Sequence, residues 1–100
     1  MKVNIINGNP VVAMLQGRLD TTAAIKVAPD FQNLNQYAAG HLVIDCNELV
    51  YISSSGLRLL LTLRKEVAAK NGKLQIRNMN EEIQQIFKIT GFINLFEIVN

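Results

Sequence analysis

The amino-acid sequence predicts one α/β domain over residues 1–100, with a mixed β-sheet that begins as an antiparallel hairpin and continues through alternating helices and strands. An Asn-Gly step between two runs of alternating polar and apolar residues indicates the hairpin, because both residues tolerate positive φ. The rest of the chain alternates helical apolar periodicity with short apolar runs, which is typical of helices that cross between parallel strands. An apolar content of 49% and the lack of a Pro-, Gly- or Ser-rich linker suit a single core.

The chain begins with the hairpin and the first helix. Residues 2–6 and 10–17 are the expected strands. A helix is expected over residues 22–37, because its apolar side chains recur on one face. Pro29 lies inside this helix and costs about 3 kcal/mol, so we expect a kink or a restart near Asp30. The candidate caps of its first turn are Asp20, Thr21 and Thr22.

A buried strand and a leucine-rich helix follow. Residues 41–46 are almost continuously apolar, which indicates a strand buried on both faces in the middle of the sheet. We expect residues 47–52 to connect this strand to a helix over residues 54–70. Asn71-Gly72 is expected to end that helix, because both residues accept the left-handed conformation common at helix ends.

The last third supplies two more strands and a helix. Lys73–Arg77 alternates polar and apolar residues and is predicted to be a strand. Asn80 is the expected cap of the third helix, and Gly91 its end. Residues 95–99 are the expected final strand. The predicted order is therefore β-β-α-β-α-β-α-β, with the helices packed on the sheet.

Composition and charge exclude several functional classes. The net charge is only +2 and the ten basic residues are scattered among eight acidic ones, so we expect no nucleic-acid partner. No apolar run reaches the roughly 18 residues of a membrane span, and the first residues lack the apolar stretch of a signal peptide, so we expect a cytoplasmic protein. The lone Cys46 lies in an apolar strand pattern and is expected to be a buried thiol. We expect no metal or cofactor.

Three serines and a glycine stand where the buried strand gives way to the second helix. The first turn of a helix has unpaired N–H groups and partial positive charge. Small hydroxyl side chains at this position can therefore cap the helix, help to bind an anion or accept a phosphate. The residues concerned are Ser53, Ser54, Ser55 and Gly56.

Catalysis by these serines finds little support in the sequence. A nucleophilic serine needs a base, and the only histidine, His41, opens the strand whose far end precedes the serines, more than about 12 Å away. The Gly-x-Ser-x-Gly pattern is absent because position 52 is Ile. Gly56 alone, without a glycine-rich run or a following Lys-Ser/Thr, is not a phosphate-binding P-loop. Arg58 could help to hold an anion, although a solvated arginine is the simpler interpretation.

Taken together, the motifs resemble the STAS domain, and within it the small bacterial anti-sigma factor antagonists. The resemblance covers essentially all 100 residues. It is carried by Gly17-Arg18-Leu19-Asp20, by Ile52-Ser53-Ser54-Ser55-Gly56-Leu57 and by Thr90-Gly91-Phe92. Family members usually read Asp-Ser-Ser/Thr-Gly-Leu at the central motif. Here Ser53 stands where the aspartate is usual, which removes a like-charged neighbour of the phosphate that the family carries on the next serine.

The resemblance implies a non-enzymatic switch. Ser54 would be the phosphoacceptor, with Ser55 as the second choice. The unmodified domain would bind an anti-sigma factor that is also a serine kinase of the histidine-kinase-like ATPase type. Phosphorylation would release the domain, and a metal-dependent serine phosphatase would restore it. The partner-binding residues implied in this way are Asp20, Thr21, Ser53, Ser55, Gly56, Leu57 and Arg58.

Two alternatives keep the same fold. In the first, the domain is not phosphorylated and serves as a scaffold or as a subunit of a transport-type assembly. In the second, the hydroxyls and backbone N–H groups at the helix start bind a nucleotide, so that the domain acts as a sensor.

Overall fold

The structure is a computed structural model that describes residues 1–99. Its five strands form one sheet in the order β1-β2-β3-β4-β5. Strand β1 (Lys2–Ile6) runs antiparallel to β2 (Val11–Leu19). The parallel neighbours that follow are β3 (His41–Ile52), β4 (Lys73–Arg77) and β5 (Glu97–Val99). The predicted mixed sheet and the predicted order of elements are confirmed.

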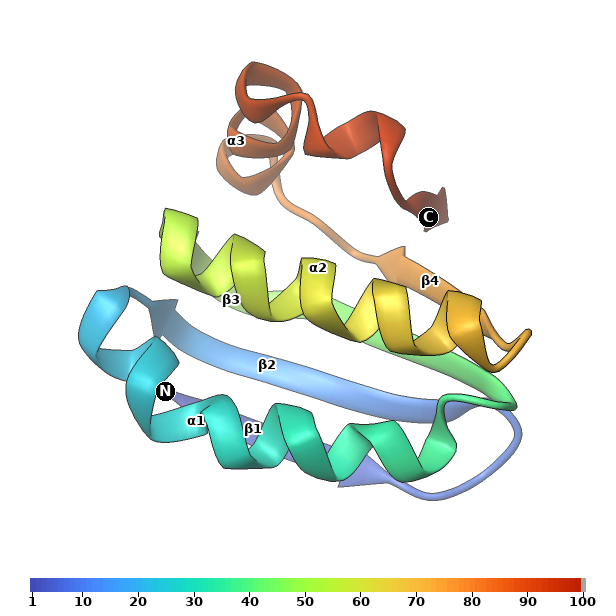
Figure 1. Cartoon of the computed structure of the whole chain (residues 1–100). Helices are drawn as coiled ribbons and strands as arrows, with labels where there is room; N and C mark the ends of the chain where they lie inside the picture. Colours follow the sequence, from blue (N-terminus) through green and yellow to red (C-terminus); the bar gives the residue numbers. More distant parts are fainter. Residues whose placement is uncertain (100) are drawn as a thin grey trace.

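Three helices complete the part of the chain that the structure describes. Figure 1 shows α1 (Thr21–Leu34) and α2 (Ser54–Ala69) side by side over one face of the sheet, with α3 (Glu81–Thr90) beyond α2. Two short 3₁₀ turns, Asn35–Tyr37 and Phe92–Asn94, follow α1 and α3. The buried apolar residues of sheet and helices form one cluster, which reaches from Val11 to Phe96. Burial of this shared apolar surface, rather than helix propensity, holds α1 and α2 against the sheet.

Helix α1 continues through Pro29, so it does not restart near Asp30, and the alternative expectation of a kink at Pro29 stays a prediction. The helix ends at Leu34, earlier than predicted, and a 3₁₀ turn takes its place. Pro29 is exposed, which leaves the carbonyl group deprived of its hydrogen bond near water. The buried residues on both sides of Pro29 share one face of α1, and burying that face offsets the cost of the proline. They are Ala24, Val27, Phe31 and Leu34.

Strand β3 is twice as long as predicted. Residues 47–52 were expected to be a connection, but they extend the strand to Ile52. The pairing of β2 with β3 shifts between Met14 and Gln16 and again between Gly17 and Arg18. At each shift β3 accommodates one extra residue, as in a β-bulge. Strand β2 correspondingly runs on to Leu19, two residues beyond its predicted end, whereas β5 begins only at Glu97.

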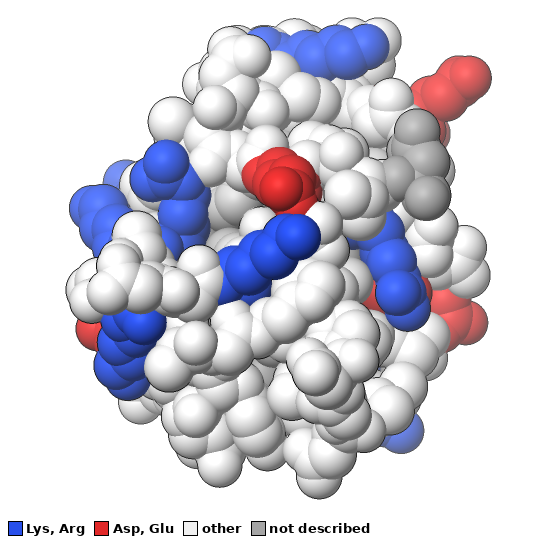
Figure 2. All heavy atoms as spheres, turned by 90° about the vertical axis from the view of Figure 1, so that its right-hand side faces the viewer, with Lys and Arg blue, Asp and Glu red and all other residues white. Residues whose placement is uncertain are grey.

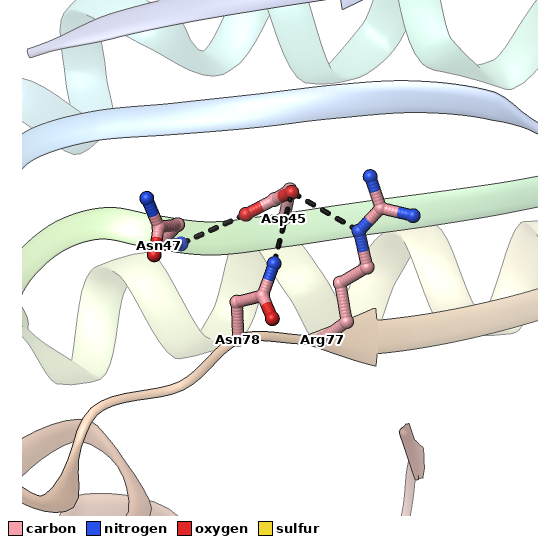
Figure 3. A network of polar contacts seen from close by, with 4 residues as sticks. All are labelled: Asp45, Asn47, Arg77 and Asn78. Carbon is pink, nitrogen blue, oxygen red and sulfur yellow. Dashed lines mark hydrogen bonds and ion pairs between the residues drawn. The ribbon is translucent and has the colours of Figure 1, made fainter. Parts of the chain in front are cut away.

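Asp45 lies at the first of these shifts and accepts hydrogen bonds from three donors around it. It is only 5% exposed. Figure 3 shows its carboxylate accepting hydrogen bonds from the backbone N–H of Asn47 at 2.8 Å, from Arg77 Nε at 3.0 Å and from Asn78 Nδ2 at 3.3 Å. Burial by itself would raise the pKa of Asp45. The hydrogen bonds and the positive charge of Arg77 outweigh burial and hold the pKa below its ordinary value of 3.8.

The stability that Asp45 contributes should therefore depend on pH. A carboxyl group with a lowered pKa in the folded state stabilises the fold above its unfolded pKa, and this contribution disappears as the pH falls through the folded value. Near pH 7, Asp45→Asn should lower the free energy of unfolding by about 1–3 kcal/mol, because an amide N–H group would face the donors of Arg77 and Asn78. Urea denaturation of both proteins should show this difference shrinking below pH 3.8. A difference that stays constant with pH would contradict this account.

Cys46 lies next to Asp45 and faces the core. It is fully buried, and burial, with a smaller effect from the charge of Asp45, raises its pKa to about 12. The thiol is thus protonated at neutral pH and poorly reactive. The predicted buried thiol is confirmed.

Candidate functional site

The three serines occupy the junction between β3 and α2, and Ser53 forms the N-cap. Its backbone is extended, with φ −89° and ψ 171°. Ser53 Oγ accepts a hydrogen bond from the backbone N–H of Gly56 at 3.2 Å, and Ser53 O accepts one from the N–H of Leu57 at 2.9 Å. The residue is 8% exposed. Of the roles that the sequence leaves open for the serines, Ser53 therefore takes that of the cap, and its hydroxyl is committed to the helix.

Gly56 and Leu57 face the core immediately after the cap. A Cβ on Gly56 would lie 2.7 Å from Leu19 Cγ and 2.9 Å from Ile52 Cγ1, so this position has no room for a side chain. Leu57 is 3% exposed and belongs to the apolar core. Contact of a partner with these two residues, which stays a prediction, would therefore rely on their backbone atoms.

Ser54, Ser55 and Arg58 lie on the outer side of the same helical turns. Ser54 is the first residue of α2 and is exposed, Ser55 is half-buried, and Arg58 is exposed. Within residues 1–99, no side-chain hydrogen bond involves the Ser54 hydroxyl. Of the three serines, Ser54 thus offers the most accessible hydroxyl, next to the partial positive charge of the helix start.

The start of α1 lies beside the start of α2. Leu19 and Ile52 are paired at the ends of β2 and β3, and the backbone N–H of Ser53 donates to Leu19 O at 2.9 Å. Asp20, the next residue, caps α1 by accepting a hydrogen bond from the N–H of Ala23 at 2.8 Å. The sheet therefore brings Asp20 and the exposed Thr21 to the same end of the molecule as Ser54. The prediction that they contact a partner stays open.

Two residues that were not among the predicted site residues, Arg18 and Tyr51, complete this end of the sheet. The guanidinium carbon of Arg18 lies 4.6 Å from the centre of the Tyr51 ring, a cation–π contact. They are paired residues on β2 and β3, each directly before the last core residue of its strand. The register between β2 and β3 would have shown that these two residues are neighbours. That register depends on the second bulge, between Gly17 and Arg18.

The structure separates His41 from the serines. His41 and Ile52 stand at opposite ends of β3, and the His41 ring nitrogen Nε2 lies 2.7 Å from Gln75 Oε1. His41 is therefore not placed to act as the base for a nucleophilic serine at the junction. Among residues 1–99, no cluster of three His, Cys, Asp or Glu side chains could bind a metal ion. No helix in the same range is long and apolar enough to cross a membrane.

Comparison with known proteins gives this fold and junction a context. The STAS domain family model matches residues 1–100. A protein of Bordetella bronchiseptica named as a candidate anti-sigma factor antagonist, BtrV, is 28% identical over 90 residues, which cover 90% of this chain and 78% of that protein. The anti-sigma-B factor antagonist of Bacillus subtilis is 26% identical over 92 residues, which cover 92% of this chain and 84% of that protein.

Solved structures share the fold. The anti-sigma factor antagonist SpoIIAA in its unphosphorylated form superposes with a TM-score of 0.71 at 19% identity, covering 99% of this chain and 86% of that one. The phosphorylated form of Bacillus SpoIIAA gives a TM-score of 0.69 at 20% identity, covering 99% and 90%. At these identities the likeness concerns the arrangement of helices and strands alone.

Proposed function

Because the chain belongs to the STAS domain family, we propose that it is an anti-sigma factor antagonist with Ser54 as its switch. The unmodified domain binds its anti-sigma factor, which thereby releases a sigma factor. Phosphorylation of Ser54 releases the domain from that partner. In this role the chain is a binding module, and the chemistry is performed by its partners.

The observation that carries this proposal is that the three serines differ in burial and in hydrogen bonding. Ser53 is buried and caps α2, and Ser55 is half-buried beside α1. The Ser54 hydroxyl is exposed on the first residue of the helix. A phosphate there lies next to the positive end of α2, so the modified domain stays folded while its surface changes.

Two partner enzymes are required. The anti-sigma factor, proposed to be a serine kinase of the histidine-kinase-like ATPase type, transfers the γ-phosphoryl group of ATP to Ser54 Oγ. The products are phosphoserine, ADP and the proton of the hydroxyl. A metal-dependent serine phosphatase restores the hydroxyl by hydrolysis, which consumes one water molecule and releases inorganic phosphate. The domain supplies the accessible hydroxyl and the surface that both enzymes recognise.

The cap supports this role without the aspartate that is usual at position 53. Ser and Asp cap helices about equally well, and Ser53 Oγ makes the expected bond to Gly56 N–H. The substitution leaves one negative charge fewer beside Ser54. Phosphorylation of Ser54 therefore adds about −1.5 to −2 charges to a turn that carries no acidic side chain of its own.

Incubation with the cognate kinase and ATP tests the proposal. Intact-mass spectrometry should show the addition of one phosphate, and fragmentation should locate it on Ser54. Ser54→Ala should abolish the mass shift and still bind the kinase, whereas Ser55→Ala should be phosphorylated like the wild type. Phosphate on Ser55, or no phosphate at all, would overturn the assignment of Ser54.

A further inference from the structure

A groove runs between α1 and α2 and begins beside the serine junction. It has a volume of about 340 Å³. A smaller hollow of about 90 Å³ shares Ala28, Leu59 and Thr62 with it and extends it along the two helices. Ile25, on its α1 side, is 74% exposed. The residues that line the groove are Ala24, Ile25, Ala28, Ser55, Arg58, Leu59 and Thr62.

The lining of the groove carries positive charge only. Arg58 is the only charged residue in its lining, and no Asp or Glu accompanies it. Across residues 1–99, the Arg58 guanidinium takes part in no hydrogen bond or ion pair. A guanidinium at the rim of an apolar groove is matched by a carboxylate, which it can bind through two parallel hydrogen bonds. The groove thus complements an apolar side chain with an acidic residue beside it.

We propose that this groove docks a segment of the anti-sigma factor that places apolar side chains against Ile25 and Leu59 and a carboxylate against Arg58. The inference rests on the proposed function, whose partner it describes more closely. The volume of the groove holds only a few side chains, so the segment binds as part of a larger surface. A contiguous apolar patch rimmed by polar residues is the usual mark of such a surface.

The position of Arg58 links the groove to the switch. Ser54 and Arg58 are four residues apart on α2, so their Cβ atoms lie about 5–6 Å apart on the same side of the helix. A phosphate on Ser54 comes within reach of the Arg58 guanidinium and competes with the carboxylate of the partner for it. The phosphate also repels that carboxylate. Phosphorylation thus removes the charge complementarity of the groove without unfolding the domain.

The end of the molecule that is remote from Ser54 carries charges of both signs. Figure 2 faces the end of α2 that is remote from Ser54, and there basic and acidic side chains lie among uncharged ones. Lys70 and Glu66, near that end of α2, pair with each other at 3.5 Å. Ile89 on α3 is 81% exposed but lines none of the hollows described above. It therefore provides a matched control for Ile25.

Isothermal titration calorimetry with purified anti-sigma factors tests the groove. Candidates are the histidine-kinase-like ATPases encoded in the genome of the source organism, and the one that binds the wild-type domain serves as the probe. Ile25→Asp and Arg58→Glu should each weaken its binding more than tenfold, whereas Ile89→Asp should bind within twofold of the wild type. Thermal melting of all variants checks that these exposed substitutions leave the domain folded.

The outcomes separate this inference from the proposed function. If Ile25→Asp and Arg58→Glu bind like the wild type while Ser54 phosphorylation still abolishes binding, the groove is not the docking site and the switch stands. If the wild-type domain binds none of the anti-sigma factors, the proposed function fails, and the docking inference fails with it.

Discussion

Replacing Ser54 with aspartate is expected to weaken the affinity for the anti-sigma factor more than tenfold, or by more than about 1.4 kcal/mol. Ser54 is the first residue of α2 and is exposed. A permanent carboxylate at this position must lose its water when the partner docks, which is costly without a compensating contact. It also repels the carboxylate that we assign to the partner opposite Arg58. Calorimetric titration measures the affinity directly.

Ser54→Asn is the matched control, because asparagine has nearly the same size as aspartate and no charge. It should bind within about threefold of the wild type, a difference below about 0.7 kcal/mol. Unfolding should not explain the loss in Ser54→Asp, since an acidic residue in the first turn interacts favourably with the helix dipole. Equal affinities of the two variants would show that charge at position 54 does not control binding, and would favour a passive scaffold.

Replacing Gly72 with alanine should produce the largest loss of stability. A Cβ at this position would lie 1.8 Å from the carbonyl oxygen of Ala38 and 2.9 Å from that of Gly40. Both are backbone atoms, so the chain itself must move, and Gly40 O also accepts the N–H of Lys73 at 2.8 Å. We expect the free energy of unfolding to fall by about 3 kcal/mol or more. In a domain of this size the melting temperature should fall by on the order of 10–20 °C.

Gly40→Ala provides the comparison for Gly72→Ala. Its Cβ would lie 3.7 Å from the carbonyl oxygen of Tyr37, an ordinary contact, and its backbone is not in the left-handed region. Alanine at such a position should leave the stability unchanged or raise it by about 0.4–1 kcal/mol, because it restricts the unfolded chain. Calorimetric melts of the two variants that coincide would mean that the approach of Gly72 to Ala38 is not as close as described.

The elements that could be predicted from the sequence are those specified by local chemistry. Asn80 Oδ1 accepts the N–H of Ile83 at 2.9 Å, and Gly91 ends α3 in the left-handed conformation, both as their residue types predict. At the end of α2, Asn71 takes a positive φ of 57° and the N–H of Gly72 donates to Val67 O. In each case a few neighbouring residues determine the geometry.

The parts that could not be predicted depend on contacts between distant segments. Residues 47–52 were expected to be a connection, and they become strand because the edge of β2 pairs with them through two bulges. Helix α1 does not restart near Asp30, because burial of its apolar face outweighs the one hydrogen bond that Pro29 removes. Burial against neighbouring elements is not visible in local patterns.

The candidate site also has one part that local sequence specifies and one part that depends on contacts between distant segments. The cap at Ser53 and the exposed position of Ser54 follow from the motif and the helix that it opens. The groove at Ile25 does not, because it exists only where α1 and α2 pack together. Ile25, which is 74% exposed, lies outside the buried face of α1 that Ala24, Val27, Phe31 and Leu34 form.

The most direct test compares the affinity of the anti-sigma factor for the unmodified domain and for the domain that carries phosphate on Ser54. Both forms can be separated by ion exchange after treatment with the kinase, verified by intact mass and titrated under the same conditions. We predict that the phosphorylated form binds far more weakly, by well over about tenfold, and that phosphatase treatment restores the original affinity. Equal affinities of the two forms would contradict the proposal that Ser54 is the switch.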